Sequence, residues 1–182
     1  MATNRRIIQR FLLLLVMAAC FRESTLHAQD DKVAIKAEMQ VLSKYLGTWD
    51  EEYDFPSRAG AVTTAEWVLD GKFVRRTGKL NIVDLEWSEM LTFDPVGKSY
   101  RRWTFDSTGF SLEYKGTWDD QTSTMTWIAE NRNGPGSQVS KISKFTFTDS
   151  TIMKWETESR NSNNELVGRR IHSVAKMRPE QK

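Results

Sequence analysis

A two-residue alternation of apolar and polar side chains runs through most of the chain after Gly47. Residues 109–118 show it most clearly, because every second residue is apolar and the residues between them are polar. Successive side chains of a β-strand point to opposite faces, so this pattern predicts a strand with one buried face. The buried face would carry Phe110, Leu112, Tyr114, Gly116 and Trp118.

Turn residues such as Asp70-Gly71 and Asp94-Pro95 interrupt the alternation, and their spacing predicts about ten strands. We expect these strands near residues 47–55, 61–69, 72–83, 86–94, 98–106, 109–118, 122–130, 138–148, 151–160 and 165–177. Short connections make each strand antiparallel to the next, and a sheet of this size removes its exposed edges by closing. The sequence therefore predicts an all-β fold, a single up-and-down antiparallel β-barrel.

One helix is expected before the first strand. Residues 29–46 place apolar side chains at spacings of three and four, which puts them on one face of an amphipathic helix. These side chains are Ile35, Met39, Leu42 and Leu46. We expect this helix to close one end of the barrel.

The first 28 residues have the pattern of a secretory signal peptide. Three arginines precede an apolar run at residues 11–21, and the small residue Ala28 precedes an acidic segment. The run is shorter than the roughly 20 residues that cross a bilayer as a helix, so no membrane span is expected. The chain is therefore predicted to be exported, to the periplasm or the extracellular space.

The sequence leaves two forms of processing open. Cleavage after Ala28 is favoured, because a small residue stands before the cut and acidic residues follow it. The alternative is a lipid anchor at Cys20, since Met17-Ala18-Ala19-Cys20 resembles a bacterial lipobox. That alternative would make the protein an outer-membrane lipoprotein.

Four segments follow from these patterns. They are a signal peptide (1–28), a helix (29–46), a barrel domain (47–177) and a C-terminal tail (178–182). Removal of residues 1–28 takes away four arginines and one glutamate, so the formal charge changes from +2 to −1. A chain of this charge has no field that would attract nucleic acid.

Composition also limits the chemistry of the mature chain. After residue 28 there is no cysteine, and His172 is the only histidine. Thiolate chemistry, disulfides and a zinc site made of His and Cys ligands are therefore excluded within one chain. We expect no metal site and no cofactor.

Three arginine doublets are the most informative feature of the predicted strands. They are Arg75-Arg76, Arg101-Arg102 and Arg169-Arg170. Neighbouring residues of a strand point to opposite faces, so each doublet should send one guanidinium group into the barrel. The alternation places Arg101 inside with Trp103 and Phe105, and Arg169 inside on the last strand; Glu89 is a candidate partner. A buried charge costs several kcal/mol unless it is paired. The inward arginines are therefore either structural ion pairs or receptors for a ligand carboxylate.

Several segments resemble the bacterial domain-of-unknown-function family 1579, a calycin-like group. The resemblance covers most of residues 40–177. It rests on Leu46-Gly47-Thr48-Trp49, on residues 65–73, on Leu91 to Tyr100, and on Trp103 to Asp119. It implies a lipocalin-like barrel and no particular reaction.

The resemblance to calycins also implies two roles for single residues. By analogy with lipocalins, Trp49 would lie across one barrel end with Arg169 or Arg170 stacked on its ring. The related nitrobindins bind haem through a histidine on a late strand, and His172 lies on such a strand. This sequence departs from the nitrobindin pattern after Trp49, where Asp50-Glu51-Glu52 replaces a glycine-containing run.

These observations favour a non-enzymatic protein that binds a small, largely apolar ligand in the barrel. If an inward arginine receives the ligand, that ligand would carry a carboxylate group. The predicted ligand-binding residues are Arg101, Arg169, Glu89, Trp67, Trp87, Trp103, Phe105, Tyr114 and Trp127. One alternative is an enzyme, either haem-dependent through His172 or a hydrolase or isomerase that uses Glu89. Another is a structural envelope module with a filled barrel.

Overall fold

The computed structural model describes residues 37–54, 59–131 and 139–179. The chain divides into two units, Met1–Glu38 and Met39–Lys182. The predicted signal peptide and Cys20 lie outside the described residues, as does the first part of the predicted helix. The fold and the site below are those of the second unit.

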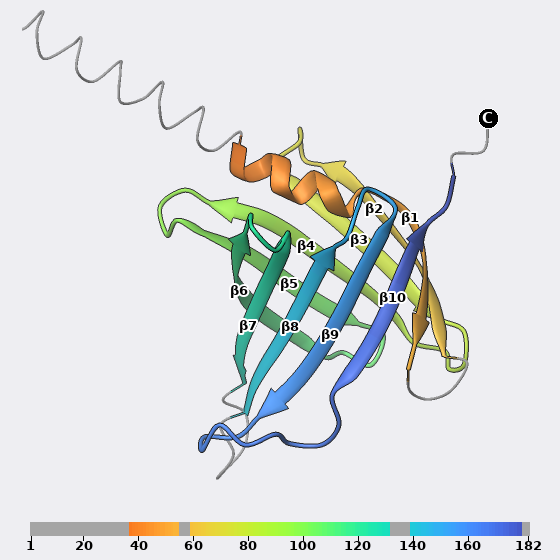
Figure 1. The fold of residues 1–182 in the computed structure, drawn as a ribbon, viewed down its shortest axis with the longest axis vertical. Coiled ribbons are helices and arrows are strands. Elements are labelled where there is room, and N and C mark those ends of the chain that lie inside the picture. The colour runs from red at the N-terminus through yellow and green to blue at the C-terminus, as the bar shows by residue number, and fades with distance from the viewer. Residues whose placement is uncertain (1–36, 55–58, 132–138, 180–182) are drawn as a thin grey trace, which may run out of the picture. The chain divides into compact units, whose positions relative to one another are not determined.

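Ten strands follow a short helical segment (Figure 1). Residues 37–42 are α-helical, and η1 (Ser43–Tyr45) continues them as a 3-10 turn. The strands are β1 (Gly47–Tyr53), β2 (Gly60–Val68), β3 (Phe73–Leu80), β4 (Glu86–Asp94), β5 (Ser99–Asp106), β6 (Ser111–Asp119), β7 (Thr124–Asn131), β8 (Val139–Phe147), β9 (Ile152–Arg160) and β10 (Ile171–Met177).

Each strand pairs with the next in antiparallel fashion, and β1 pairs with β10 to close the sheet into a barrel. Trp49 lies opposite Met177 in the closing pair, and Tyr53 lies opposite Ser173. Closure gives each of these ten described strands two paired neighbours, so none of the ten lies at a free edge. The prediction of an up-and-down barrel of about ten strands behind a helix is confirmed.

The last strand is shorter than predicted. Residues 165–170 were expected to belong to it, but β10 begins only at Ile171. Asn161 Oδ1 accepts hydrogen bonds from the backbone N–H groups of Asn163 and Glu165 in the turn after β9, and Leu166 then forms only an isolated bridge with Arg160. Gly168 then takes a positive φ of 77°, a conformation that interrupts an extended strand.

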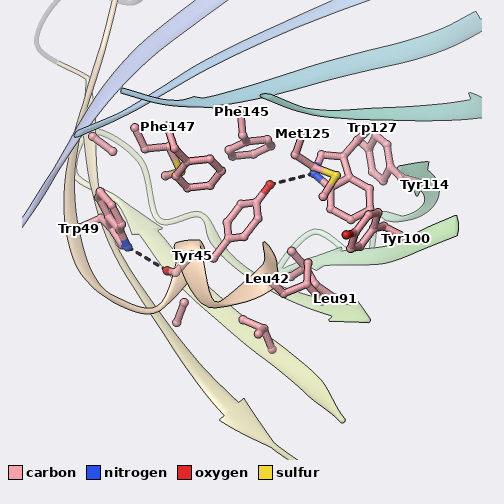
Figure 2. Close-up of a cluster of buried hydrophobic side chains, with 14 of the residues drawn as sticks. Leu42, Tyr45, Trp49, Leu91, Tyr100, Tyr114, Met125, Trp127, Phe145 and Phe147 are labelled. Atoms are coloured by element: carbon pink, nitrogen blue, oxygen red, sulfur yellow. Dashed lines mark hydrogen bonds between the residues drawn. The ribbon is translucent and has the colours of Figure 1, made fainter. Parts of the chain in front are cut away.

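The helical segment fills one end of the barrel (Figure 2). Leu42 and Tyr45 are fully buried there, and the Tyr45 ring packs edge-on against Phe145 at a centroid distance of 5.4 Å. Trp127 Nε1 donates a hydrogen bond to the Tyr45 hydroxyl oxygen at 3.1 Å, and Trp49 Nε1 donates to the Tyr45 carbonyl oxygen at 2.9 Å. This half of the interior is a solid aromatic core.

The expected stacking of Arg169 or Arg170 on Trp49 is wrong. Trp49 lies beside the C-terminal end of β10, whereas both arginines precede its first residue and so lie near the opposite barrel end. Arg178 follows β10 near Trp49, but its guanidinium group pairs outside the barrel with Asp50 at 2.6 Å. The buried indole of Trp49 is held by Tyr45 instead.

The Tyr45 hydroxyl group gives a direct test of this end of the barrel. We expect Tyr45→Phe to lower the free energy of unfolding by about 1–3 kcal/mol, because the buried indole N–H of Trp127 loses its acceptor. Urea unfolding monitored by tryptophan fluorescence measures the change.

A double-mutant cycle supplies the control for this prediction. Trp127→Phe removes the donor, so adding Tyr45→Phe to that variant should cost less than it costs in the unchanged chain. Equal costs in both backgrounds would contradict the proposed role of the hydrogen bond.

Candidate functional site

The half of the barrel away from the helical segment contains a cavity of about 340 Å³. Its wall near the open end is largely apolar, and its inner part is charged. The apolar and aromatic lining includes Leu80, Ile82, Leu85, Trp87, Phe110 and Trp155, and the charged lining includes Glu51, Arg76, Glu89, Arg102 and Lys141. Charged groups therefore separate an apolar cavity from the aromatic core.

Strand alternation and register bring the charged groups together. Glu51 on β1 and Arg76 on β3 point inward between outward-facing neighbours. Arg76 lies directly opposite Glu89 of β4 in the ladder. Arg102 of β5 points inward opposite Tyr114 of β6. Successive strands thus contribute one charged or hydroxyl group each to the same level of the barrel.

Arg76 pairs with two carboxylates through its two terminal nitrogens, while its Nε has no hydrogen-bond partner in the described part of the chain. Its Nη1 lies 2.9 Å from Glu89 Oε2, and its Nη2 contacts Glu51. The hydroxyl groups of Thr63 and Tyr53 donate to the oxygens of Glu51 at 2.6 and 2.9 Å. The three charged groups and Thr63 are buried and Tyr53 is partly buried, so the pairing offsets the cost of removing the charges from water.

Arg102 is less completely paired. Among the described residues, the only carboxylate oxygen within 4 Å of its guanidinium group belongs to Glu89, at 3.9 Å, which is longer than a hydrogen bond. The guanidinium carbon lies 3.8 Å from the centroid of the Tyr114 ring, and Nε has no hydrogen-bond partner in the described part of the chain. The side chain is only 3% exposed. Arg102 is therefore a buried cation with spare hydrogen-bonding capacity that borders the cavity.

The electrostatics fix the ionisation of these groups. Burial alone would raise the pKa of Glu89, but Arg102 and Arg76 outweigh burial and hold it below its ordinary value. Burial raises the pKa of Tyr53 and Tyr114, so both hydroxyl groups stay protonated. Burial, and then the charge of Arg102, lower the pKa of Lys141. A carboxylate with a lowered pKa is a weak general base, which argues against a hydrolase or isomerase that uses Glu89.

Five of the nine predicted ligand-binding residues point into the barrel. Trp87, Glu89 and Tyr114 line the cavity. Trp127 is fully buried in the aromatic core, and Trp67 packs against that core. The last two are therefore packing residues and do not border the cavity.

The predicted orientation of β5 is wrong. Arg101, Trp103 and Phe105 lie on the outer face, and Arg102 is the inward arginine of the doublet. Arg101 pairs outside with Glu113, and its guanidinium carbon lies 5.5 Å from the centroid of the Trp103 ring. Both faces of this strand carry aromatic and arginine side chains, so the alternation could not distinguish inside from outside.

Arg169 also lies outside the cavity, because the segment that contains it is not part of β10. Its side chain is 58% exposed and lies 3.9 Å from Asp54 Oδ2. His172 is on the outer face of β10, with Nδ1 3.5 Å from Glu156 Oε2. The alternative in which His172 ligates haem inside the barrel is therefore wrong.

The sequence-based prediction missed Glu51, Arg76, Arg102 and Lys141. It also missed Gly78, which faces the Trp87 ring across the β3–β4 pair. A Cβ atom at Gly78 would lie 2.2 Å from Trp87 Cζ2, so the glycine makes room for this indole in the cavity wall. A glycine in the middle of a strand was the available signal.

Comparison with known proteins gives no relative for this chain, since no family model and no curated protein matches it. The resemblance to family 1579 stays a prediction. Within the described ranges, no group of three or more His, Cys, Asp or Glu side chains could hold a metal ion. No helix in those ranges has the length and apolar character of a membrane span.

Arg76 and its neighbour Arg75 form a matched pair for testing the buried ion pairs. We expect Arg76→Met to destabilise the fold by roughly 3–5 kcal/mol, because two buried carboxylates lose their shared cation. Arg75→Met removes an exposed ion pair with Glu66 and should cost less than about 1 kcal/mol. If urea unfolding shows that both variants lose the same free energy of unfolding, the buried ion pairs of Arg76 do not hold the interior together.

The lowered pKa of Glu89 predicts a loss of stability in acid. The Glu89 carboxylate binds a proton more readily in the unfolded chain than in the folded chain. Its contribution to the free energy of unfolding is therefore present above its unfolded pKa of about 4.3. That contribution is lost as the pH falls through the pKa of the folded state. Urea unfolding between about pH 6 and pH 3 should show a flatter pH dependence in Glu89→Gln than in the unchanged chain. Glu66→Gln, on the exposed surface, should leave the slope of the unfolding free energy against pH unchanged. If Glu89→Gln also leaves this slope unchanged, the lowered pKa of Glu89 is wrong.

Proposed function

We propose that this protein binds a small, largely apolar molecule that carries an anionic group, most simply a carboxylate. The observation that carries the proposal is the placement of Arg102, a buried and incompletely paired guanidinium group, at the inner end of an apolar cavity. A bound carboxylate would complete its hydrogen bonds in a region from which water is largely excluded.

The pairing of the charged groups around the cavity supports an anionic ligand at Arg102. Glu51 and Glu89 are the buried acids, and both are held by Arg76. Arg102 is a further buried cation, and in the described part of the chain no carboxylate holds it at hydrogen-bond distance. Asp106 also borders the cavity, but its Oδ1 accepts hydrogen bonds from Thr108 and Phe110 in the adjoining turn.

The size and lining of the cavity limit the ligand. A volume of about 340 Å³ lies near the lower end of the usual range for ligand pockets, so a short-chain or aromatic acid fits better than a full-length lipid. Trp87, Phe110 and Trp155 offer apolar surface for such a ligand. The cavity argues against the alternative of a filled barrel. Export remains part of this proposal and rests on the sequence of residues 1–28 alone.

Decanoate and decanol give a test, because they share an alkyl chain and differ in charge. Decanoate should bind the unchanged protein more tightly than decanol, and Arg102→Gln should weaken decanoate binding by roughly 10- to 100-fold while changing decanol binding little. Quenching of tryptophan fluorescence reports binding, because Trp87 and Trp155 line the cavity.

Arg101→Gln is the matched control, since this neighbouring arginine points outward. It should bind both probes like the unchanged protein. Decanol binding by Arg102→Gln shows that the variant has folded; if it has not, Arg102→Lys keeps the charge and should still weaken decanoate binding, because lysine lacks the planar donor pair. Equal affinity of the unchanged protein for the two probes would contradict the proposal.

A further inference from the structure

Lys141 is a basic group inside the barrel that the proposed function does not require. It lies on the inner face of β8, two residues before the buried Ser143, and it borders the cavity. Lys144, three residues further along the strand, points outward and is 49% exposed beside Glu156. One strand thus carries an interior lysine and a surface lysine.

The surroundings of Lys141 favour an uncharged amine. The charged groups that act on it are Arg102, Glu89 and Asp106, and among them the guanidinium group of Arg102 has the largest effect. No carboxylate in the described part of the chain forms an ion pair with Nζ at 4.0 Å or less. Burial and the nearby cation both lower its pKa, so more of the amine carries a free lone pair at neutral pH than in a surface lysine.

We propose that the cavity also accepts apolar aldehydes and that Lys141 binds them covalently and reversibly as an imine. The inference rests on the proposed function, because the apolar wall that would hold the tail of an acid would hold the tail of an aldehyde. It extends the ligand class from anions to carbonyl compounds.

The reaction needs no further reagent. The Nζ lone pair attacks the carbonyl carbon, a C–N bond forms, and a proton passes from nitrogen to the former carbonyl oxygen. The resulting hydroxyl group leaves with a second proton as water, and a C=N bond replaces the C=O bond. One aldehyde and one amine thus give one imine and one water molecule, with no change of oxidation state.

The cavity favours this product over the imine of a surface lysine. Trp87 and Phe110 supply apolar surface that concentrates an apolar aldehyde near Lys141. A wall that limits access of water also slows the reverse hydrolysis. Tyr114 and Ser143 bring hydroxyl groups to the same cavity, and the Tyr114 hydroxyl stays protonated because burial raises its pKa.

Reductive trapping with cinnamaldehyde and cyanoborohydride tests the inference on the intact mature chain at neutral pH. Cyanoborohydride converts an imine into a stable secondary amine, which intact-mass measurement counts and peptide mapping locates. Lys141 should be the main site and should be labelled roughly tenfold faster than Lys144. Labelling in proportion to the exposure of each lysine would overturn the inference.

Two variants and one competitor complete the test. Lys141→Gln should lose the main adduct and Lys144→Gln should keep it. Decanol should slow labelling of Lys141 by competition for the cavity and leave labelling of Lys144 unchanged. If Lys141→Gln does not fold, peptide mapping of the unchanged protein still decides the question.

Failure of this inference differs from failure of the proposed function. If decanoate binds through Arg102 and cinnamaldehyde does not label Lys141 selectively, the imine inference is wrong and the proposed function stands. If Lys141 is labelled selectively and decanoate binds no better than decanol, the carboxylate site is wrong and the cavity still binds carbonyl compounds.

Discussion

Arg76 lies between two buried carboxylates in the middle of the barrel, and the rest of the interior is arranged around this ion pair. Charges removed from water must be paired closely, and the antiparallel register supplies the partners by placing Glu89 directly opposite Arg76. The charged groups then divide the interior. The aromatic core and helical segment fill one side, and the other side keeps a cavity.

The same arrangement explains why Arg102 differs from Arg76. Glu89 is already engaged by Arg76 and Thr104, so it offers Arg102 only a contact of 3.9 Å. Aromatic rings on β6, β7 and β8 take the place of a second carboxylate, with the Tyr114 ring nearest. Rings support a guanidinium group through its face, and Nε of Arg102 has no acceptor in the described part of the chain. A cation held in this way is suited to receive an anion from the cavity.

Much of the fold could be predicted from the sequence, because a closed antiparallel barrel depends on local alternation and short turns. The inward positions of Trp87, Glu89 and Tyr114 followed from the same rule. The rule failed on β5, where both faces carry an arginine and aromatic side chains, and only the position of neighbouring strands decides which face is buried. It failed again at Arg169, because pairing with β9 stops after Val167 and the positive φ of Gly168 interrupts the extended chain before β10 begins.

A crystal structure of residues 29–182 with decanoate is the most direct test, because it measures the position of a bound carboxylate relative to Arg102. The account predicts a carboxylate oxygen within about 3 Å of an Arg102 nitrogen, and the alkyl chain between Trp87 and Phe110. A structure in which Arg102 forms a bidentate pair with Glu89 and the cavity is closed would contradict it.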